Sequence, residues 1–486
     1  MAKITKQSDN FSKWYTDVIL DADLADYGPV KGTMVVKPYG FSLWTNIRDS
    51  LNKMIEDSGH DNAYFPLFIP KSFLEKEAKH VEGFAKECAV VTHSKLISEE
   101  GSLTVDPESK LEEEIIVRPT SETIIWHMFK KWITSYRDLP LKVNQWANVV
   151  RWEMRTRLFL RTSEFLWQEG HTAHATKEEA MKETLEIVEI YRTLFEDYLA
   201  IPTIIGRKSN LERFAGADET FSIETMMRDK KALQAGTSHY LGTNFGSAFD
   251  VKFQSKDNKE HPVYATSWGV STRMVGALIM VHGDDKGLKI PPKIAPTQVV
   301  IVPINPKKEK SEEFSSFVIK VEEKLIHLDI RTHIDDLDES PGFKFNKWEL
   351  KGVPIRIEIG LKEFENMEVT VCRRDDSEKY QIQIDKIDEI PTILQSIQDN
   401  LFNDAKTFMD NNTCTVSSFA DFTDTLSKNN QFIKAYWDGT DETELKIKEK
   451  TKATIRCIVE DNEDSSNKCI FSGETAKHLV VFAKAY

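Results

Sequence analysis

The chain has 486 residues, of which 40% are hydrophobic and 29% charged, and its formal net charge is −14 at pH 7. This length predicts about three domains, and the composition is ordinary for a soluble globular protein. No apolar run is long enough to cross a bilayer, no secretory signal opens the chain, and the five cysteines are scattered. We therefore expect a cytoplasmic protein without a membrane partner. The acidic balance also argues against nucleic acid, unless a local basic face compensates.

The N-terminal region combines a long helix with a short strand. Apolar residues recur at a helical spacing over residues 41–57, and a strand punctuated by prolines follows at 62–70. Farther on, the sequence Arg-Pro-Thr-Ser-Glu at 118–122 begins another helix. Thr120 or Ser121 would cap that helix, and capping is the preferred interpretation of Ser121.

Val143, Trp146, Val149 and Val150 predict a strand that runs into Arg151, and residues 162–168 predict a second strand. A short polar and basic loop joins them, which predicts an antiparallel pair. Because side chains alternate along a strand, one face of this pair is expected to carry Arg151, Glu153, Arg161, Phe165, Trp167, Glu169 and His171. An isolated Arg-x-Glu is usually a surface ion pair of little value. A core would not hold so much charge, however, and a solvated face would not also use Trp and Phe. The face suits a nucleotide, because arginine binds phosphate, glutamate accepts from an amine and phenylalanine stacks on a base.

Three later segments add to this picture. Residues 176–200 predict an amphipathic helix. His171 and His174 lack a third ligand nearby, so a pocket wall is a better interpretation than a zinc site. The glycine-rich residues 234–246 fit neither a Walker loop nor a dinucleotide fingerprint. Residues 268–273 lead into a helix that is apolar all round and is therefore expected to be buried.

A proline-rich linker at residues 289–296 marks the first domain boundary. Beyond it strands and helices alternate, and the first strand, at 299–304, is apolar throughout, which predicts a small α/β domain with a mixed sheet. Between residues 341 and 362 five basic residues stand against two acidic ones. Such a run is usually a solvated face, but it would also supply the basic surface that RNA binding needs. A third, smaller unit follows from about residue 411.

The central stretch resembles a known family. Arg-x-Glu at 151–153 and Arg-x-x-x-Phe at 161–165 resemble motif 2 of the class II aminoacyl-tRNA synthetases. The residues from Arg161 to His171 resemble the prolyl type of that family. The helix and strand within 41–70 resemble motif 1. Gly-Val-Ser-Thr-Arg at 269–273, followed by its apolar helix, resembles motif 3. The resemblance covers essentially the whole chain.

This resemblance implies an α+β protein with three parts: a class II antiparallel-sheet catalytic domain (1–290), an α/β anticodon-binding domain (297–405) and a small α+β C-terminal zinc-type domain (411–486). It implies ligation of L-proline to tRNA(Pro) through a prolyl-adenylate, with ATP and Mg²⁺ as cofactors. A homodimer through motif 1 is implied as well.

The resemblance also implies residue roles. The catalytic residues would be Arg151, Arg161 and Arg273. The ATP-binding residues would be Arg151, Glu153, Arg161, Phe165, Gln234, Thr237, Ser271 and Arg273. The proline-binding residues would be Phe84, Thr120, Glu122, Arg151, Trp167, Glu169, His171 and His239. The anticodon-binding residues would be Lys344, Glu349, Arg356 and Lys362.

Departures from the family carry their own expectations. The four cysteines of its C-terminal metal site fall here on Asp438, Thr443, Cys469 and Ser472. Protonated hydroxyls bind zinc poorly, so this domain is expected to fold without metal. The motif 2 and motif 3 segments are too close in sequence to enclose the editing domain that many bacterial prolyl enzymes insert, which predicts the archaeal/eukaryotic-like type. Tyr486 matches the family's last residue and is expected to be ordered near the catalytic site.

Two alternatives stay open at this point. One is another class II specificity, such as threonyl or glycyl, although the sequence offers no ligand set for the zinc that threonyl enzymes carry in the amino-acid pocket. The other is a synthetase-like protein that binds tRNA or an amino acid without ligating them. The intact motif arginines, together with Glu153, argue against it.

Overall fold

The computed structural model of the chain describes residues 4–77, 87–304 and 311–486. Its centre is an eleven-stranded sheet with the strand order β22-β23-β25-β24-β11-β12-β13-β16-β10-β9-β3. The strands from β11 to β9 all pair antiparallel, as the resemblance to class II synthetases implies. The strands are β3 (Asp61–Asn62), β9 (Leu141–Val150), β10 (Glu164–His174), β11 (Ile204–Arg207), β12 (Glu219–Met226), β13 (Ala232–Gly242), β16 (Tyr264–Ser271), β22 (Thr413–Thr415), β23 (Phe432–Trp437), β24 (Thr454–Asp461) and β25 (His478–Ala483).

The strand predicted to run into Arg151 is β9 and the strand predicted to follow the loop is β10; they pair antiparallel, with Phe165 opposite Val149. β10 begins at Glu164, so Arg161 lies in the connection between the strands and its side chain is exposed. The prediction that Arg161 shares a strand face with Phe165 is therefore wrong. The reason is a local turn in which Arg157 and Arg161 form an isolated antiparallel bridge before the strand begins.

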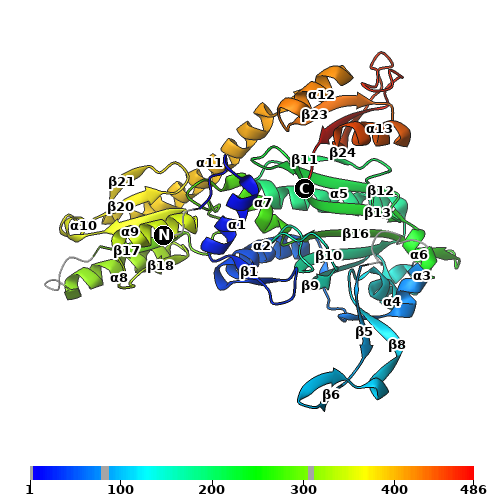
Figure 1. The fold of residues 1–486 in the computed structure, drawn as a ribbon, viewed down its shortest axis with the longest axis horizontal. Helices are drawn as coiled ribbons and strands as arrows, with labels where there is room; N and C mark the ends of the chain where they lie inside the picture. Colours follow the sequence, from blue (N-terminus) through cyan, green and yellow to red (C-terminus); the bar gives the residue numbers. More distant parts are fainter. Residues whose placement is uncertain (1–3, 78–86, 305–310) are drawn as a thin grey trace.

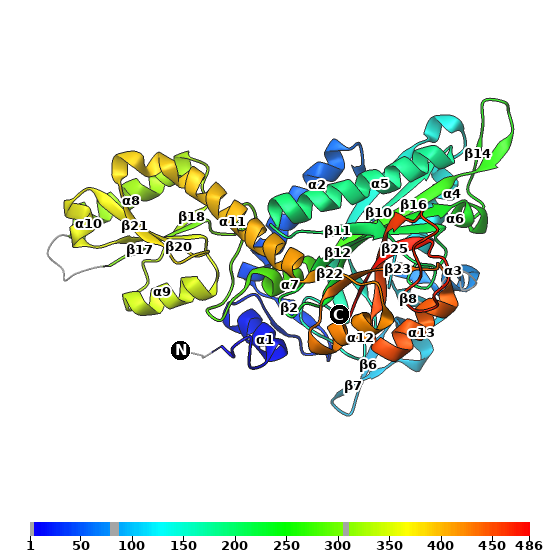
Figure 2. The ribbon, with the colours of Figure 1, turned by 90° about the horizontal axis from the view of Figure 1, so that it is seen from above.

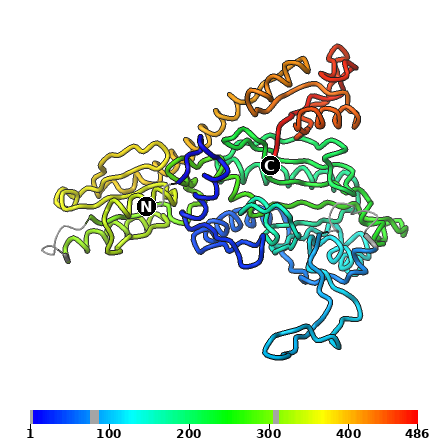
Figure 3. Tube along the Cα trace, in the orientation of Figure 1, coloured from blue at the N-terminus to red at the C-terminus, as the bar shows by residue number. Residues whose placement is uncertain are grey.

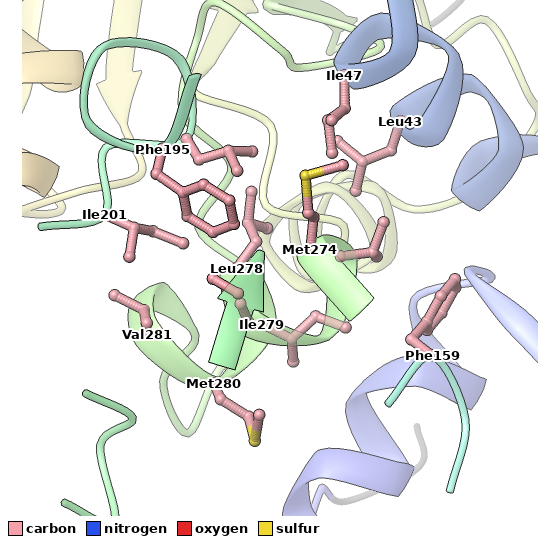
Figure 4. Close-up of a cluster of buried hydrophobic side chains, with 14 of the residues drawn as sticks. Leu43, Ile47, Phe159, Phe195, Ile201, Met274, Leu278, Ile279, Met280 and Val281 are labelled. Atoms are coloured by element: carbon pink, nitrogen blue, oxygen red, sulfur yellow. The ribbon is translucent and has the colours of Figure 1, made fainter. Parts of the chain in front are cut away.

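Helices bury one face of the antiparallel strands from β11 to β9, which are called the catalytic sheet after the catalytic domain that the resemblance implies. α5 (Lys177–Thr193) lies against β10, β12, β13 and β16, with α2 (Pro38–Asp57) beside it (Figure 2). α7 (Arg273–His282) is buried along its length after the first residue, which confirms the expectation for an apolar helix. Figure 4 shows its Met274 and Leu278 in one cluster with Leu43 and Ile47 of α2. This core supports the sheet from the side opposite the cavity described below.

The rest of the N-terminal region surrounds this sheet. β4, β8 and β5 form a three-stranded sheet, and beyond it the β6–β7 hairpin projects from the body (Figures 1 and 3). Within the part of the chain that the structure describes, no helix has the length and apolar character to cross a membrane. The elements are α1 (Phe11–Asp21), β1 (Ala25–Tyr27), β2 (Met34–Val36), β4 (Phe68–Pro70), α3 (Lys71–Glu77), β5 (Ala89–His93), β6 (Leu96–Glu99), β7 (Ser102–Val105), η1 (Pro107–Ser109), β8 (Lys110–Val117), α4 (Glu122–Trp132), η2 (Tyr136–Asp138), η3 (Leu194–Tyr198), α6 (Asn244–Ala248), β14 (Lys252–Gln254) and β15 (Glu260–Pro262).

A second unit follows the proline-rich linker. Its five-stranded sheet has the order β18-β17-β19-β20-β21, with parallel pairs on both sides of β17 and antiparallel pairs beyond β19. This is the predicted small α/β domain with a mixed sheet. Its elements are β17 (Val299–Pro303), α8 (Ser311–His327), β18 (Thr332–Ile334), α9 (Pro341–Leu350), β19 (Ile355–Ile359), α10 (Leu361–Glu365), β20 (Glu368–Arg373), β21 (Lys379–Gln383) and η4 (Ile384–Glu389).

The long helix α11 (Ile390–Asn411) leads from this domain to a C-terminal unit (Figure 1). That unit holds β22 to β25 with α12 (Phe419–Lys428) and α13 (Asp441–Thr451). Its strand β24 joins the catalytic sheet at β11. A buried ion cluster lies at this junction, where the Glu224 carboxylate is 2.8 Å from Lys208 Nζ and 3.0 Å from Arg456 Nε.

Asp438 occupies the place of the first expected metal ligand in the C-terminal unit. Its Oδ2 accepts hydrogen bonds from Thr443 Oγ1 at 2.8 Å and from Ser472 Oγ at 2.6 Å. Cys469 is buried. One carboxylate, two hydroxyls and one thiol do not fit structural zinc, which takes four nitrogen or sulfur ligands. Among the described residues, no group of three His, Cys, Asp or Glu side chains could hold a metal ion.

Candidate active site

A cavity of about 510 Å³ lies over the face of the catalytic sheet opposite α5. Strands β10, β13 and β16 supply its floor, and the turn before α4 and the first residue of α7 supply part of its wall. The residues predicted from sequence that line it are Thr120, Glu122, Arg151, Phe165, Trp167, Glu169, His171, Gln234, Thr237, His239, Ser271 and Arg273. Segments far apart in the chain thus converge on one hollow.

Arg151 follows β9 directly and lies over two aromatic rings of β10. Its guanidinium carbon is 5.6 Å from the ring centre of Phe165 and 5.4 Å from that of Trp167. Its Nε donates to the carbonyl of Pro119 at 3.0 Å. Burial lowers the pKa of this guanidinium, although carboxylates nearby, Glu122 first among them, oppose the shift. A buried arginine on aromatic plates is pre-organised to bind an anion.

Arg273 opens α7 on another side of the same cavity. Its Nε donates to the carbonyl of Leu160 at 3.2 Å and its NH1 to the carbonyl of Gln234 at 3.4 Å. Burial, together with the positive charges of Arg161 and Arg151, lowers the pKa of Arg273 to about 10. Mutual repulsion among three guanidiniums is relieved when a polyanion binds between them.

Glu169 is the most fully hydrogen-bonded acid of the cavity. Its Oε1 accepts from Ser121 Oγ at 2.5 Å and from Gln145 Nε2 at 2.7 Å, and its Oε2 lies 3.4 Å from His171 Nε2. Burial alone would raise the pKa of this carboxyl, but the His171 imidazole and the two other donors hold it below its ordinary value. The acid is therefore an anion at neutral pH.

Thr120 and Glu122 also line the cavity, and together with Glu169 they form what we call its acidic corner. Thr120 Oγ1 donates to the Glu122 carboxylate, so both predicted proline-binding groups face the same space. Ser121 occupies the N-cap position of α4, but its side chain makes no capping hydrogen bond. The prediction that Ser121 caps the helix is therefore wrong in its contact, because Glu169 on the adjacent strand is a charged acceptor within reach.

His239 forms a neutral wall of the cavity. Thr220 Oγ1 is 2.9 Å from its Nδ1 and Thr237 Oγ1 is 3.1 Å from its Nε2. Burial, with the nearby His171, lowers the pKa of His239 to about 3. The Phe214 ring packs on the imidazole with 4.6 Å between ring centres. An uncharged imidazole beside a phenyl ring suits an aliphatic or weakly polar ligand.

Some predicted residues lie elsewhere, and other residues were missed. Glu153 is half-buried outside the cavity lining, Arg161 is exposed, and Phe84 lies outside the described residues. The lining residues that were not predicted from the sequence are Glu212, Arg213, Phe214, Ala215, Thr220, Ala235, Gly236, Ser267, Trp268, Gly269 and Val270. Most of them lie on β13 and β16, which also carry predicted site residues, whereas residues 212–215 form a loop whose position only the fold determines.

The predicted anticodon residues do not form one cluster. Lys344 is buried and donates to the Asp335 carbonyl at 2.8 Å, so its ammonium is used inside the domain. Lys362 is exposed on α10. Glu349 and Arg356 share a small cavity of about 60 Å³ with other basic residues of that domain. Arg356 donates to Glu358 at 2.9 Å.

Comparisons with known proteins agree with this geometry. Residues 104–282 match the tRNA synthetase class II core domain (G, H, P, S and T), residues 298–393 an anticodon binding domain, and residues 419–486 the prolyl-tRNA synthetase C-terminal domain. The fold is thus that of a class II aminoacyl-tRNA synthetase.

Relatives specify the member of that class. The chain is 54% identical to a proline–tRNA ligase of Flavobacterium johnsoniae, with 99% of each chain covered, and 53% identical to that of Cytophaga hutchinsonii, with 100% of each covered. A crystal structure of prolyl-tRNA synthetase from Cryptosporidium parvum, complexed with halofuginone and AMPPNP, matches with a TM-score of 0.92 and 38% identity over 99% of this chain and 96% of that one. The chain belongs to the prolyl-tRNA synthetase family, the proline–tRNA ligases.

Proposed function

We propose that the cavity joins proline first to the AMP part of ATP and then to tRNA, in two displacements. In the first, the proline carboxylate attacks the α-phosphorus of ATP and pyrophosphate leaves. In the second, a terminal ribose hydroxyl of the tRNA attacks the prolyl carbonyl and AMP leaves. A carboxylate is already a nucleophile, so catalysis rests on positioning and charge stabilisation. The observation that carries this proposal is the convergence of Arg151 and Arg273 with the acids Glu122 and Glu169 on one cavity.

Arginines would hold the nucleotide phosphates. Arg151 would bind the α-phosphate and the proline carboxylate, which accumulate negative charge together. Arg161 and Arg273 would take the β- and γ-phosphates, and the lowered pKa of Arg273 next to Arg161 supports a polyanion there. Arg161 is exposed in the connection between β9 and β10, so its side chain is free of packing that would prevent it from turning toward the phosphates.

The base and ribose would lie toward the strand ends. Phe165 would stack on adenine, Glu153 would accept from its amine, and Gln234, Thr237 and Ser271 would contact the nucleotide. We propose that Mg²⁺ enters with ATP as part of the substrate, since Mg²⁺ commonly binds through substrate phosphates with few protein ligands. The role of Glu153 requires its half-buried side chain to turn toward the cavity, because it does not line the cavity here.

The acidic corner would bind the amino acid. Glu122, Thr120 and Glu169 would receive the prolinium nitrogen, which keeps two N–H donors and a positive charge. Trp167, His171 and His239 would wall the ring, together with Phe84. The buried Nδ1 of His171 has no hydrogen-bond partner in the described part of the chain, and this supports a polar ligand in its neighbourhood.

ATP–pyrophosphate exchange with each of the twenty amino acids tests the assignment. We expect exchange that depends on proline, and Arg151→Ala should lower its rate by about 10²–10³ because a pre-organised charge donor is lost. Exchange dependent on threonine or glycine would favour another class II specificity. No exchange with any amino acid would favour a binding protein without ligase activity.

We infer the archaeal/eukaryotic-like type without an inserted editing domain. The structure between β10 and α7 is occupied by α5, η3, β11 to β16 and α6, and the single class II match runs through it. A pocket rejects a ligand smaller by one methylene by only about 1–3 kcal/mol, so alanine and cysteine should be activated to a measurable extent. Efficient hydrolysis of Ala-tRNA by the purified protein would contradict this inference.

We also propose a homodimer through residues 44–70, as in class II enzymes. Trp44 itself is buried in the core, so the contact would come from the exposed apolar side chains Tyr64 and Phe68. Sedimentation at micromolar concentration should give twice the chain mass, and a monomer would contradict the assignment of motif 1. We further propose that the chain works in the cytoplasm and that residues 1–290, 297–405 and 411–486 act as its domains. The second domain would bind the tRNA anticodon through Lys344, Glu349, Arg356 and Lys362. Lys344 would first have to leave its buried position.

A further inference from the structure

The pocket loop, residues 208–218 between β11 and β12, has no regular secondary structure yet forms a wall of the active-site cavity. Its two ends are tied to neighbouring elements: Lys208 Nζ donates to Glu224 Oε1 at 2.8 Å, and the Asp218 backbone N–H donates to the Tyr240 carbonyl at 2.9 Å. Between these ends, over residues 209–215, the hydrogen bonds of the loop itself are few and local. Glu212 donates its backbone N–H to the Ser209 carbonyl at 3.2 Å, and Arg213 NH1 donates to the Asp218 carbonyl at 2.5 Å. A loop of this kind needs support from elsewhere to keep a fixed position.

Support comes from α13 in the C-terminal unit. Ser209 Oγ donates to Glu444 Oε1 at 2.8 Å, and both side chains are buried. One turn later on the same helix face, Lys448 Nζ donates to Glu212 Oε1 at 3.1 Å. The two contacts hold the loop at its base and at the first residue that lines the cavity.

These polar contacts are needed because packing between the two parts is incomplete. A cavity of about 130 Å³ lies there, lined by Ser209, Asn210 and Arg213 from the loop and by Trp437 and Gly439 from the C-terminal unit. A void of this size removes van der Waals contacts that would otherwise fix the loop. The two contacts from α13 therefore help to fix residues 209–213, between the loop ends that the sheet holds.

The loop in turn fixes the wall of the amino-acid site. Its Phe214 packs on the His239 ring, and the Phe214 backbone N–H donates to Thr220 Oγ1 at 3.2 Å. The same hydroxyl lies 2.9 Å from His239 Nδ1. A shift of the pocket loop would therefore move Phe214 against His239 and change the shape of the space proposed for the pyrrolidine ring.

We propose that Glu444 and Lys448 of α13 are positioning residues for amino-acid binding, which act through the pocket loop on Phe214 and His239. This proposal rests on the proposed function, because it assigns that wall to proline. It gives the C-terminal unit a role in the first half-reaction, before tRNA is involved. Neither residue touches the cavity, so both would act on binding of the amino acid and leave the phosphate arginines in place.

The test is steady-state ATP–pyrophosphate exchange with full-length protein, titrating proline and ATP separately. The variants are Lys448→Met, Ser209→Ala and Glu444→Met, with Lys448→Arg as the conservative rescue. Lys446→Met is the matched control, because Lys446 lies on the same helix and, within the part of the chain that the structure describes, pairs with Glu442 at 2.5 Å on the exposed side. Thermal unfolding of each variant reports on folding.

We expect Lys448→Met and Ser209→Ala to raise the KM for proline about three- to tenfold, on the order of the loss of one surface or neutral hydrogen bond. The KM for ATP and kcat should stay within twofold of wild type. Lys448→Arg should restore the KM for proline and Lys446→Met should not change it. If Glu444→Met does not fold, Ser209→Ala still removes the same hydrogen bond from the loop side.

Two results would overturn the proposal. One is a KM for proline that is the same in Lys448→Met, Ser209→Ala and Lys446→Met. The other is a lower kcat with KM values for proline and for ATP that rise equally, together with a lower unfolding temperature. That result would mean that α13 only stabilises the fold. Absence of proline-dependent exchange in the wild-type protein would instead refute the proposed function.

Discussion

Replacement of Glu169 by glutamine isolates the charge of the acidic corner. Glutamine has the same shape and keeps a carbonyl oxygen that can accept from Ser121 and Gln145, as Glu169 Oε1 does at 2.5 and 2.7 Å. Its amide nitrogen would then face His171 Nε2, now 3.4 Å from Oε2, and the imidazole can accept that bond by changing tautomer. The local hydrogen bonds therefore survive while the negative charge is lost.

The magnitude follows from the state of this carboxyl. Its donors hold the pKa of Glu169 below the ordinary value in spite of burial, so the wild-type protein presents an anion to the substrate at neutral pH. A hydrogen bond to a charged group contributes about 1.5–3 kcal/mol, roughly twice a neutral one. At 1.36 kcal/mol for each tenfold change, its loss should raise the KM for proline about 10- to 100-fold. The KM for ATP should change less than about threefold.

The assay is proline-dependent ATP–pyrophosphate exchange, with Glu164→Gln as the control. Glu164 is the first residue of the same strand, and its exposed carboxylate accepts from Asn148 at 2.8 Å. The control should keep wild-type constants. A KM for proline in Glu169→Gln within twofold of the control would remove Glu169 from the substrate and leave it a structural role.

Three further outcomes are expected. Gly170→Ala should destabilise the protein by about 1–3 kcal/mol in denaturant unfolding, because its Cβ would lie 2.1 Å from the Trp268 ring; Gly342→Ala, with nothing within 4 Å, should not. Tyr486→Ala should slow aminoacylation, because the Tyr486 ring stacks on Arg157 between β9 and β10; unchanged kinetics would count against this contact. Burial raises the pKa of Glu444 to about 7 from 4.5, so the folded state holds a proton that the unfolded state releases, and stability should fall as pH rises between these values. Glu444→Gln should abolish that slope, and a parallel pH profile would contradict the shift.

The floor of the active site was predictable because a strand has only two faces. Once residues 164–174 are recognised as a strand, parity alone places Phe165, Trp167, Glu169 and His171 on one surface, and the structure keeps them there. The buried helix α7 was predictable for a similar reason, since a helix without a polar face has no stable position in water.

Long-range contacts set the limit of such reasoning. The start of α4 was correctly placed next to Ser121, but the partner of its hydroxyl belongs to a strand far along the chain. The pocket loop gave no signal, because Asn-Leu-Glu-Arg-Phe at 210–214 is an ordinary polar loop until β11 and β12 carry it to the cavity. Arg161 was misplaced because strand parity was extended past a turn.

The cluster around Asp438 explains how the C-terminal unit can hold its loops without zinc. Burial alone would raise the pKa of the Asp438 carboxyl, but hydrogen bonds from Ser472, Thr440 and Thr443 hold it below its ordinary value near 3.8. Because the folded-state pKa is depressed, the stabilisation is present above the unfolded value and is lost as pH falls through the folded one. The carboxylate thus joins the start of α13 to the loop at Ser472, and it uses three of the four positions at which the resemblance places metal ligands.

Two variants and a metal analysis distinguish a C-terminal unit held by the Asp438 carboxylate from one held by zinc. Asp438→Ala should lower the stability of the unit by about 1–3 kcal/mol at neutral pH, because buried hydroxyls lose their acceptor. Elemental analysis of the wild-type protein should find far less than one zinc per chain. The triple variant Asp438→Cys, Thr443→Cys and Ser472→Cys, which adds three thiols to Cys469, should bind about one zinc and gain stability that a chelator removes. Near one zinc in the wild-type chain, lost together with stability on chelation, would show that the ligands lie elsewhere and that the hydrogen-bonded carboxylate is not what holds this unit.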